Sequence, residues 1–324
     1  MSDRGLVAES VAEPGIRLLR QSCQVDVRVG LSPGELLQTI GDYDALIVRS
    51  GTRVTAEVLA SGKRLVVVAR AGTGVDNIDL GAATRGGVLV VNAPTSNTVA
   101  VAEHTIALML CLARHVARAD DTMHAGKWQK RDLMGTELRD KVLGLVGLGR
   151  VGSAVSSRAR GLEMKVIAYD PFVSPDRAAK LNVEMVGLDD LLSRADYVSL
   201  HAPSTERTRG MIGTRELALM KRRAHLINCA RGDLVVAEDL VQALREGRIA
   251  GAALDVVVIV SNISEALRQC PNLVLTPHLG ASTEEAQGGA ARQVAQQVVD
   301  VLQGDTPRYP VNVVAVSSEE LTFL

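Results

Sequence analysis

The chain has 324 residues, of which 47% are hydrophobic, and this is enough to bury a large core in about two domains. Its formal net charge of −1 excludes the broad positive field used by proteins that bind nucleic acid or membrane surfaces, and no apolar run reaches the roughly 18 residues of a membrane span. The scattered cysteines show no metal or disulfide spacing and the N-terminus has no apolar signal, so we expect a metal-free cytoplasmic protein.

Short Val-rich segments predict the strands of the protein. They alternate with stretches of helical composition, a pattern typical of parallel sheets that are covered by helices on both faces. In chain order the predicted strands are residues 45–48, 65–68, 88–91, 142–146, 165–169, 197–200, 226–228, 252–256 and 273–275.

A long apolar segment divides these strands into two groups. It runs from Thr98 to Lys127 with helical periodicity, so we predict one connecting helix there. A second connection is expected near Gly280, before a predicted helix over residues 284–303 and an extended tail. The long helix also suggests a homodimer.

The segment 142–170 has the pattern of a dinucleotide-binding site: a strand, a glycine turn, a helix and a second strand that ends on an acid. Gly147 and Gly149 let the backbone turn tightly and approach a pyrophosphate, and Gly152 lets the helix pack on the strand. The phosphates then lie at the helix N-terminus, where free N–H groups favour negative charge. A glycine turn can also serve packing alone, but the flanking strands favour the dinucleotide.

The acid at the end of the second strand indicates which dinucleotide is bound. Asp170 is placed to accept the ribose hydroxyls, and Pro171 and Phe172 offer nothing to a 2′-phosphate. NAD is therefore favoured over NADP.

These observations predict an α/β protein of two doubly wound parallel-sheet domains. A Rossmann NAD domain of residues 95–281 is inserted in a flavodoxin-like substrate domain of residues 1–94 and 282–324. The substrate is expected in the cleft at the hinge.

Six segments follow one another in the order of a known family. They are ARAGTGVDNID at residues 69–79, GTEL at 135–138, VGLGRVG at 146–152, NCARGDLV at 228–235, GAALDV at 251–256 and TPHLGAS at 276–282. Together they resemble the D-2-hydroxyacid dehydrogenases over nearly the whole chain, and most closely the catalytic part of the phosphoglycerate dehydrogenases. The resemblance implies NAD-dependent oxidation of a D-2-hydroxy acid, with 3-phosphoglycerate, oxidised to 3-phosphohydroxypyruvate in serine biosynthesis, as the expected substrate. Because the chain ends at Leu324, we expect no serine feedback through further C-terminal domains.

The resemblance assigns two catalytic residues. Arg231 would grip the substrate carboxylate in bidentate fashion, and His278 would exchange the hydroxyl proton as acid or base. The remaining histidines match no such role and are expected at surface or packing positions: His104, His115, His124, His201 and His225.

The chain departs from the family pattern at the acid that orients the catalytic histidine, because Val260 occupies that position. Three interpretations remain open. Glu265 reaches back to His278, His278 works without an acid at a reduced rate, or the protein has lost activity and acts as an NAD(H)-binding sensor or partner. A reductase of hydroxypyruvate or glyoxylate is the rival within the enzymes.

The resemblance also implies the ligand contacts. Besides the three glycines and Asp170, the expected cofactor contacts are Thr73, Arg150, Val151, Ala202, Pro203, Cys229, Ala230, Arg231, Asp255, His278, Gly280 and Ala281, with Asp255 near the carboxamide. The expected substrate contacts are Arg49, Ser50, Arg70, Ala71 and Gly72, with Lys130 adding charge from a second subunit. The backbone N–H groups of Ala71, Gly72 and Thr73 could form a nest for a carboxylate.

Overall fold

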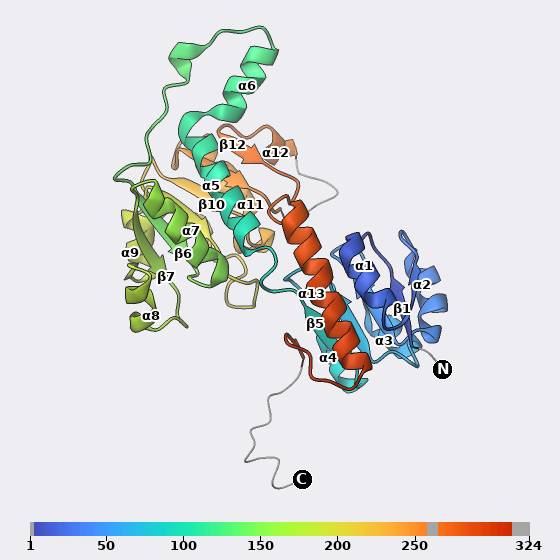
Figure 1. Ribbon diagram of the computed structural model, residues 1–324. Helices are drawn as coiled ribbons and strands as arrows, with labels where there is room; N and C mark the ends of the chain where they lie inside the picture. The colour runs from blue at the N-terminus through green and yellow to red at the C-terminus, as the bar shows by residue number, and fades with distance from the viewer. Residues whose placement is uncertain (1–2, 258–264, 313–324) are drawn as a thin grey trace. The chain divides into compact units, whose positions relative to one another are not determined.

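A computed structural model describes residues 3–257 and 265–312 of the chain (Figure 1). These residues form two compact units. The first unit contains the described residues up to Asn97 together with those from Thr283 onward, and the second unit contains those from Thr98 to Ser282.

The first unit is built on a five-stranded parallel sheet with the order β2-β1-β3-β4-β5. This is one of the common doubly wound strand orders. The strands are β1 (Arg4–Val7), β2 (Gln24–Val27), β3 (Ala45–Val48), β4 (Val67–Arg70) and β5 (Leu89–Asn92). The helices are α1 (Glu13–Arg20), α2 (Pro33–Thr39), α3 (Ala56–Ser61), α4 (Leu80–Arg85) and α13 (Glu284–Leu302), with the 3₁₀ helix η1 (Ile40–Asp42).

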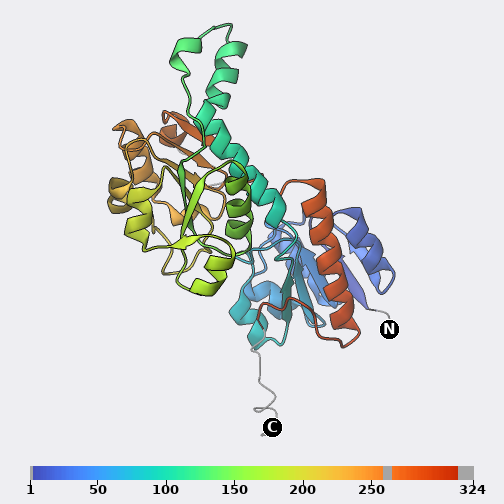
Figure 2. The same cartoon turned by 60° about the vertical axis from the view of Figure 1, so that its left-hand side comes forward.

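Both faces of this sheet are covered, which explains why its strands are continuous apolar runs. In β3, Leu46 and Val48 face the core under α2, α3 and α4, whereas Ala45 and Ile47 face the core under α1 and α13. Figure 2 shows α13 beside α1 on the same side of the sheet.

The second unit is built on a seven-stranded parallel sheet with the order β12-β11-β10-β9-β6-β7-β8. The strands are β6 (Val142–Val146), β7 (Lys165–Tyr169), β8 (Glu184–Met185), β9 (Tyr197–Leu200), β10 (His225–Asn228), β11 (Gly251–Leu254) and β12 (Leu273–Leu275). The chain winds outward from β6 in one direction and then returns to β9 and winds outward in the other. The reversal between β6 and β9 is the switch point, where doubly wound folds bind their ligands.

Helices cover both faces of the second sheet. One core lies under α5 (Thr98–Arg114), α7 (Arg150–Gly161) and α8 (Pro175–Lys180), and another lies under α9 (Leu188–Arg194), α10 (Thr214–Leu219), α11 (Ala237–Arg245) and α12 (Glu265–Arg268). The remaining helical segments are α6 (Val116–His124) and the 3₁₀ helices η2 (Lys130–Asp132) and η3 (Gly232–Leu234).

The predicted fold class is confirmed, and all nine predicted strands are present with bounds that differ by at most two residues. Three strands were not predicted. β2 reads QVDV and is only partly buried at the edge of its sheet, β8 has two residues, and β1 is a single short run near the N-terminus. Such segments lack the continuous apolar run on which the prediction depended.

The prediction of one helix from Thr98 to Lys127 is wrong. The helix α5 ends at Arg114, His115 adopts a left-handed conformation with φ of 53°, and α6 begins at Val116. The chain bends by 64° between these two helices. None of the described helices has by itself the length and apolar composition of a membrane span. Taken together, α5 and α6 have that length and composition.

Packing of α1 on α13 depends on a glycine. An added Cβ at Gly15 would lie 2.6 Å from the carbonyl oxygen of Ala291, well inside van der Waals contact. We therefore expect Gly15→Ala to push the helices apart and to lower the free energy of unfolding by about 1–3 kcal/mol, measured by chemical denaturation. Gly34→Ala in α2 is the matched control, since a Cβ there meets nothing within 4 Å and should stabilise the helix by up to about 1 kcal/mol. Equal effects of both changes would contradict close packing at Gly15.

Candidate functional site

Four loops that carry predicted site residues emerge at one edge of the second sheet. They follow β6, β10, β11 and β12, and because these strands are parallel, their carboxyl ends share an edge. The loops carry Gly147, Arg231, Asp255 and His278 respectively. The structure therefore brings the predicted glycine turn and both predicted catalytic residues to the same edge of one unit.

At two positions of the turn after β6, backbone conformation and close contacts within the protein require glycine. Gly147 has φ of 100°, and an added Cβ would lie 2.8 Å from the carbonyl carbon of His201. A Cβ on Gly152 would overlap the carbonyl oxygen of Gly147, so this glycine lets α7 start directly against the turn. Their presence is explained by packing and gives no information on any ligand.

Gly149 is different, because nothing in the described part of the chain requires it to be glycine. Its φ of −71° is open to any residue, and an added Cβ would meet no atom within 4 Å. It precedes α7, a helix of 12 residues whose first turn is capped by no side chain of the described residues. Bare backbone at an uncapped helix N-terminus is the geometry that admits a pyrophosphate, so the turn fits a dinucleotide. Arg150 and Val151 begin this helix.

Asp170 lies beyond the end of β7 and is tied to the same turn. Its Oδ2 accepts a hydrogen bond of 2.8 Å from the N–H of Leu148, and its Oδ1 accepts one of 2.9 Å from the N–H of Phe172. These bonds fix the carboxylate beside the glycine turn and leave lone pairs for ribose hydroxyls. Ala202 and Pro203 follow β9, on the other side of the switch point.

His201 lies beneath the glycine turn at the end of β9. Its Nε2 is 2.9 Å from the hydroxyl of Ser199, and burial lowers its pKa to about 4. The imidazole is therefore neutral at physiological pH and acts as a packing residue.

The turn that carries Arg231 is shaped by Asn228, a fully buried residue that closes β10. Its Nδ2 donates to the carbonyl of Arg231 at 2.7 Å, and its Oδ1 accepts from the N–H of Ala230 at 3.0 Å. The guanidinium of Arg231 in turn donates to the carbonyl of Ala230 at 2.7 Å. Asn228 was not predicted as a site residue, although a polar side chain at the end of an apolar strand was a usable signal.

Cys229 lies in the same turn. Burial raises the pKa of its thiol to about 12, so the thiol stays protonated and is no nucleophile. Its predicted role as a cofactor neighbour stays a prediction.

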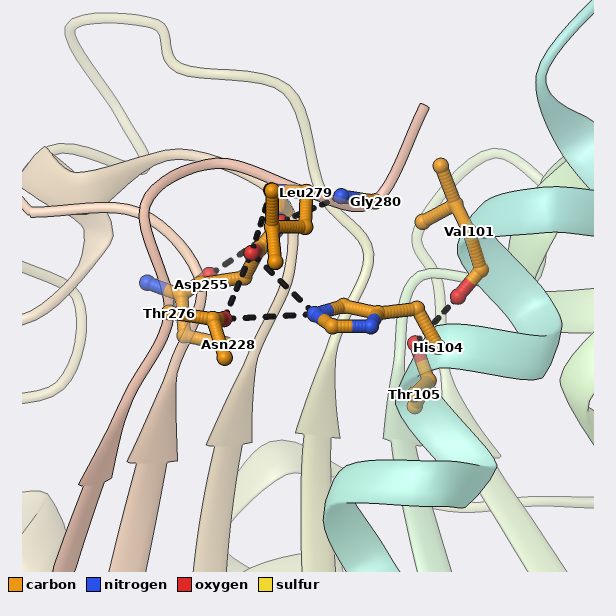
Figure 3. Close-up of polar contacts among 9 residues, drawn as sticks. Val101, His104, Thr105, Asn228, Asp255, Thr276, Leu279 and Gly280 are labelled. Atoms are coloured by element: carbon orange, nitrogen blue, oxygen red, sulfur yellow. Dashed lines mark hydrogen bonds and ion pairs between the residues drawn. The ribbon is translucent and has the colours of Figure 1, made fainter. Parts of the chain in front are cut away.

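The loop that carries His278 is fastened to a single buried residue, Asp255 (Figure 3). Oδ1 of Asp255 accepts from the Thr276 hydroxyl at 2.6 Å and from the N–H of Leu279 at 2.7 Å, and Oδ2 accepts from the N–H of Gly280 at 2.8 Å. The N–H of His278 donates to the carbonyl of Asp255 at 2.9 Å. The backbone on both sides of His278 is thus fixed, and His278 itself is held at φ of 57°.

A fourth donor to Asp255 comes from α5. The Nε2 atom of His104 lies 3.1 Å from Oδ1 of Asp255 and 3.2 Å from the Thr276 hydroxyl. His104 is largely enclosed, as expected for a packing position, and it also makes polar contacts that the prediction did not include. Sequence patterns could not find this contact, because 151 positions separate the two residues.

The donors around Asp255 decide its charge. Burial alone would raise the pKa of this carboxyl, but the hydrogen bonds from His104, Thr276 and the N–H groups of Leu279 and Gly280 outweigh burial and lower the pKa to about 2. Asp255 is thus an ionised anchor inside the unit, neither a helix cap nor a solvated acid. Among the described residues Oδ2 accepts only from Gly280, which leaves a lone pair for the expected carboxamide.

The predicted substrate loop of the first unit is also built around a carboxylate. Glu9 follows β1 and accepts three backbone hydrogen bonds, from Arg49 at 2.6 Å, Gly51 at 3.0 Å and Thr52 at 2.9 Å. The amide of Asn77 donates to the carbonyls of Arg49 and Thr52. These bonds fix the loop that presents Arg49 and the exposed Ser50 beyond the carboxyl end of β3. Neither Glu9 nor Asn77 was predicted.

Arg70 ends β4 at the same edge of the first sheet, and the chain turns immediately after it. Gly72 has φ of 155°, and an added Cβ would overlap the Arg70 guanidinium, so the glycine makes room for that side chain. The N–H groups of Ala71 and Gly72 are bonded to the carbonyls of Val48 and Arg70. This removes two of the three donors of the predicted nest, and that interpretation is wrong.

Two further predicted residues belong to different units: Thr73 directly follows Gly72 in the turn of the first unit, and Lys130 belongs to the second unit. Thr73, in the first unit, donates its hydroxyl to Asn97 at 2.9 Å. Lys130 lies exposed on η2, beyond α6. The structure of one chain does not bring Lys130 to the site edge of its own unit.

The position of the missing acid, Val260, lies outside the described residues. Glu265, the proposed replacement, begins α12 as an exposed residue, and its carboxylate accepts a 2.7 Å hydrogen bond from Gln269 of the same helix. Its hydrogen bond is local to that helix.

A glycine turn at the switch point of a doubly wound sheet, with an acid after the second strand, defines a dinucleotide-binding domain. Residues 106–280 match the NAD-binding domain of the D-isomer-specific 2-hydroxyacid dehydrogenases. The chain belongs to this family, and its second unit carries the family's NAD-binding domain.

Similar proteins extend this match to nearly the whole chain. The chain is 46% identical over 319 residues to D-3-phosphoglycerate dehydrogenase of Synechocystis sp., covering 98% of this chain and 58% of that protein. It is 47% identical over 323 residues to D-3-phosphoglycerate dehydrogenase 2, chloroplastic, of Arabidopsis thaliana, covering 99% and 52%. Among solved structures, the TT0316 protein from Thermus thermophilus matches with a TM-score of 0.88 at 36% identity, covering 95% of this chain and 99% of that one. The chain spans between half and three-fifths of the length of these two curated relatives.

The open space at Gly149 gives a direct test of the dinucleotide site. Gly149→Ala should lower the midpoint of thermal unfolding only slightly, by the cost of alanine at a helix N-cap, because the added methyl group meets no protein atom. The same methyl group stands where a pyrophosphate approaches, so the Kd for NADH, measured by fluorescence titration, should rise about ten-fold or more, equivalent to about 1.4 kcal/mol.

Gly161→Ala at the end of α7 is the matched control, since that position is equally open and lies at the other end of the helix. It should leave the Kd unchanged and, like Gly34→Ala, should not lower the unfolding midpoint. An unchanged Kd in Gly149→Ala would place the dinucleotide elsewhere.

Proposed function

We propose that the protein is an NAD-dependent dehydrogenase that oxidises D-3-phosphoglycerate to 3-phosphohydroxypyruvate. The observation that carries the proposal is the single sheet edge at which the glycine turn, Arg231 and the anchored His278 emerge. The names of the curated relatives support the substrate.

In this mechanism the chain's residues bind the acid and move one proton. The Arg231 guanidinium binds the substrate carboxylate with two parallel hydrogen bonds, which orients the carbon bearing the hydroxyl group. An imidazole nitrogen of His278 takes the hydroxyl proton as the oxygen becomes a carbonyl. NAD, when bound, supplies the acceptor for the hydride that leaves the same carbon. In the reverse direction His278 returns the proton.

The charges of the first unit support a phosphorylated substrate. Arg49 and Arg70 both lie at the carboxyl edge of the first sheet, and Glu9 fixes the backbone of the Arg49 loop. A reductase of glyoxylate or hydroxypyruvate needs no such pair of cations. Lys130 is proposed to add a third cation from a second subunit.

Asp170 supports NAD as the cofactor rather than NADP. Its carboxylate is fixed beside the glycine turn, so a 2′-phosphate on the ribose would approach a like charge. Phe172, which follows two positions later, is 90% exposed and carries no positive charge to compensate it.

The valine at position 260 sets the expected rate. Loss of the carboxylate that orients a catalytic histidine costs about 10⁴ in rate in another histidine-dependent site, with residual catalysis retained. We propose that the protein turns over slowly, because a valine side chain at this position cannot orient an imidazole as a carboxylate does. The second candidate function, an NAD(H)-binding sensor or partner without turnover, rests on the same valine.

We also propose a homodimer formed through the second units. The segment from α6 to Met134, which we call the arm, projects away from the sheet beyond the end of α5 (Figure 1). No residue of α6 is buried, and large apolar side chains of the arm are exposed: Val116 by 53%, Met123 by 54%, Trp128 by 79% and Met134 by 85%. Several large exposed apolar side chains on one projecting segment favour that segment as an interaction surface.

The decisive assay follows NADH formation by the purified protein with NAD and a panel of D-2-hydroxy acids. D-3-phosphoglycerate should be oxidised with a higher kcat/KM than D-glycerate, its analogue without phosphate. Arg49→Gln should raise the KM for D-3-phosphoglycerate about 10- to 100-fold, the effect of losing a charge-assisted hydrogen bond, and leave the KM for D-glycerate unchanged.

Glu265→Gln should leave turnover unchanged, because that carboxylate bonds within its own helix. A loss of turnover in this variant would revive the interpretation in which Glu265 replaces the missing acid. Tight NADH binding without oxidation of any acid in the panel would overturn the enzyme and leave the sensor.

The dimer is tested by sedimentation velocity. The wild-type chain should sediment as a dimer, and Trp128→Ser combined with Met134→Ser should shift it toward the monomer because both changes remove apolar area from the arm. Phe172→Ser, an equally exposed apolar residue outside the arm, is the matched control and should stay dimeric. A monomeric wild-type chain would contradict the proposal.

A further inference from the structure

The buried carboxylate of Asp255 collects hydrogen bonds from two different parts of the second unit. Three donors to this carboxylate belong to the segment that carries His278, namely the hydroxyl of Thr276 and the backbone N–H groups of Leu279 and Gly280. His104 is the donor from outside that segment, and it comes from α5 (Figure 3). The contact therefore links a helix of the core to the loop of the proposed base.

The proton of this contact can be assigned from its neighbours. An ionised carboxylate only accepts hydrogen bonds, and the Thr276 hydroxyl uses its proton in the 2.6 Å bond to Asp255. The Nε2 atom of His104 must therefore carry the hydrogen, which it shares between Asp255 at 3.1 Å and Thr276 at 3.2 Å. The imidazole is mostly enclosed, with 19% of its side chain exposed, so water is a poor substitute for this donor.

The hydrogen bond from His104 matters because the backbone of the loop is strained at His278. His278 is held at φ of 57°, a conformation that residues other than glycine adopt only when their surroundings impose it. Three of the hydrogen bonds that hold this segment run to Asp255: the N–H groups of Leu279 and Gly280 donate to its carboxylate, and the N–H of His278 donates to its carbonyl. A shift of the Asp255 carboxylate would therefore move the backbone of Leu279 and Gly280, which directly follow His278 in the chain.

We propose that His104 is a positioning residue for His278 and acts through Asp255. It touches neither of the proposed reacting groups, and its contribution is to hold the carboxylate to which the loop is fastened. This inference rests on the proposed function of His278 as the proton acceptor.

Three substitutions at position 104 separate the hydrogen bond from simple packing. Gln places an amide nitrogen close to the position of Nε2 and keeps the donor. Asn is too short to reach Asp255, and Leu fills the space with no donor at all. Leu108→Ala, one turn further along the same face of α5 and only 4% exposed, is the control that destabilises the helix without touching Asp255.

The kinetic test measures kcat and KM with D-3-phosphoglycerate and NAD. His104→Leu and His104→Asn should lower kcat about 10- to 100-fold, as expected for a misplacement of about 1 Å at the reacting groups, with a change in KM below about threefold. His104→Gln should stay within about threefold of wild type. Leu108→Ala should lower the unfolding midpoint and keep kcat within about threefold.

A second readout needs no turnover. In protein labelled with ¹⁵N-histidine, the titration curve and tautomer of His278 are followed by NMR without cofactor or substrate. The titration midpoint should move in His104→Leu and His104→Asn and stay at the wild-type value in His104→Gln and Leu108→Ala.

The kinetic and NMR measurements distinguish a failure of the proposed function from a failure of the inference about His104. A wild-type protein that shows no turnover overturns the proposed function, whereas the NMR comparison still decides whether His104 positions His278. A His104→Leu protein with wild-type kcat and a wild-type His278 titration, whatever its stability, overturns the inference. So does a His104→Gln protein that is impaired as severely as His104→Leu.

Discussion

The organisation of the second unit depends on burying one negative charge. A carboxylate taken out of water without partners costs several kcal/mol or more, so Asp255 can be fully enclosed only when its donors are in place. Those donors come from α5, from the residue after β12 and from the loop beyond it. The requirement thus couples the helix, the strand end and the His278 loop, and it explains how a strained backbone conformation persists at the proposed base.

The glycines of the turn after β6 show how packing and ligand binding can be told apart. Gly147 and Gly152 are fixed by close backbone contacts within the protein and would be needed without any ligand. Gly149 meets no such packing demand: it is the N-cap of α7, where glycine is a favoured residue, and the space beside it is open to a group that approaches from outside. A family fingerprint treats the three positions alike, whereas in the structure only Gly149 of the three leaves open space beside the turn.

The sequence predicted those features whose causes are local or carried by a family motif. The signals for strands such as β3 and β9 and for the turn at Gly147 lie in consecutive residues. Arg231 and His278 were predicted from family motifs. His104 and Glu9 were missed because their partners are remote: His104 is 151 positions from Asp255, and Glu9 is 40 positions from Arg49. No pattern within either segment reveals such a pair, because only the folded sheet brings the segments together.

The same distinction bears on the valine at position 260. The base of this reaction has two requirements. Its side chain must be held in position, and its protonated imidazolium form must be stabilised. In this chain the first requirement is met by Asp255, which fastens the backbone of His278 from both sides. Val260 cannot accept a hydrogen bond from an imidazole, so its effect falls on the second requirement and leaves the first intact. The hydrogen bonds that join the His278 loop to Asp255 do not involve position 260, and this favours the proposed slow enzyme over a binding protein whose histidine has moved away.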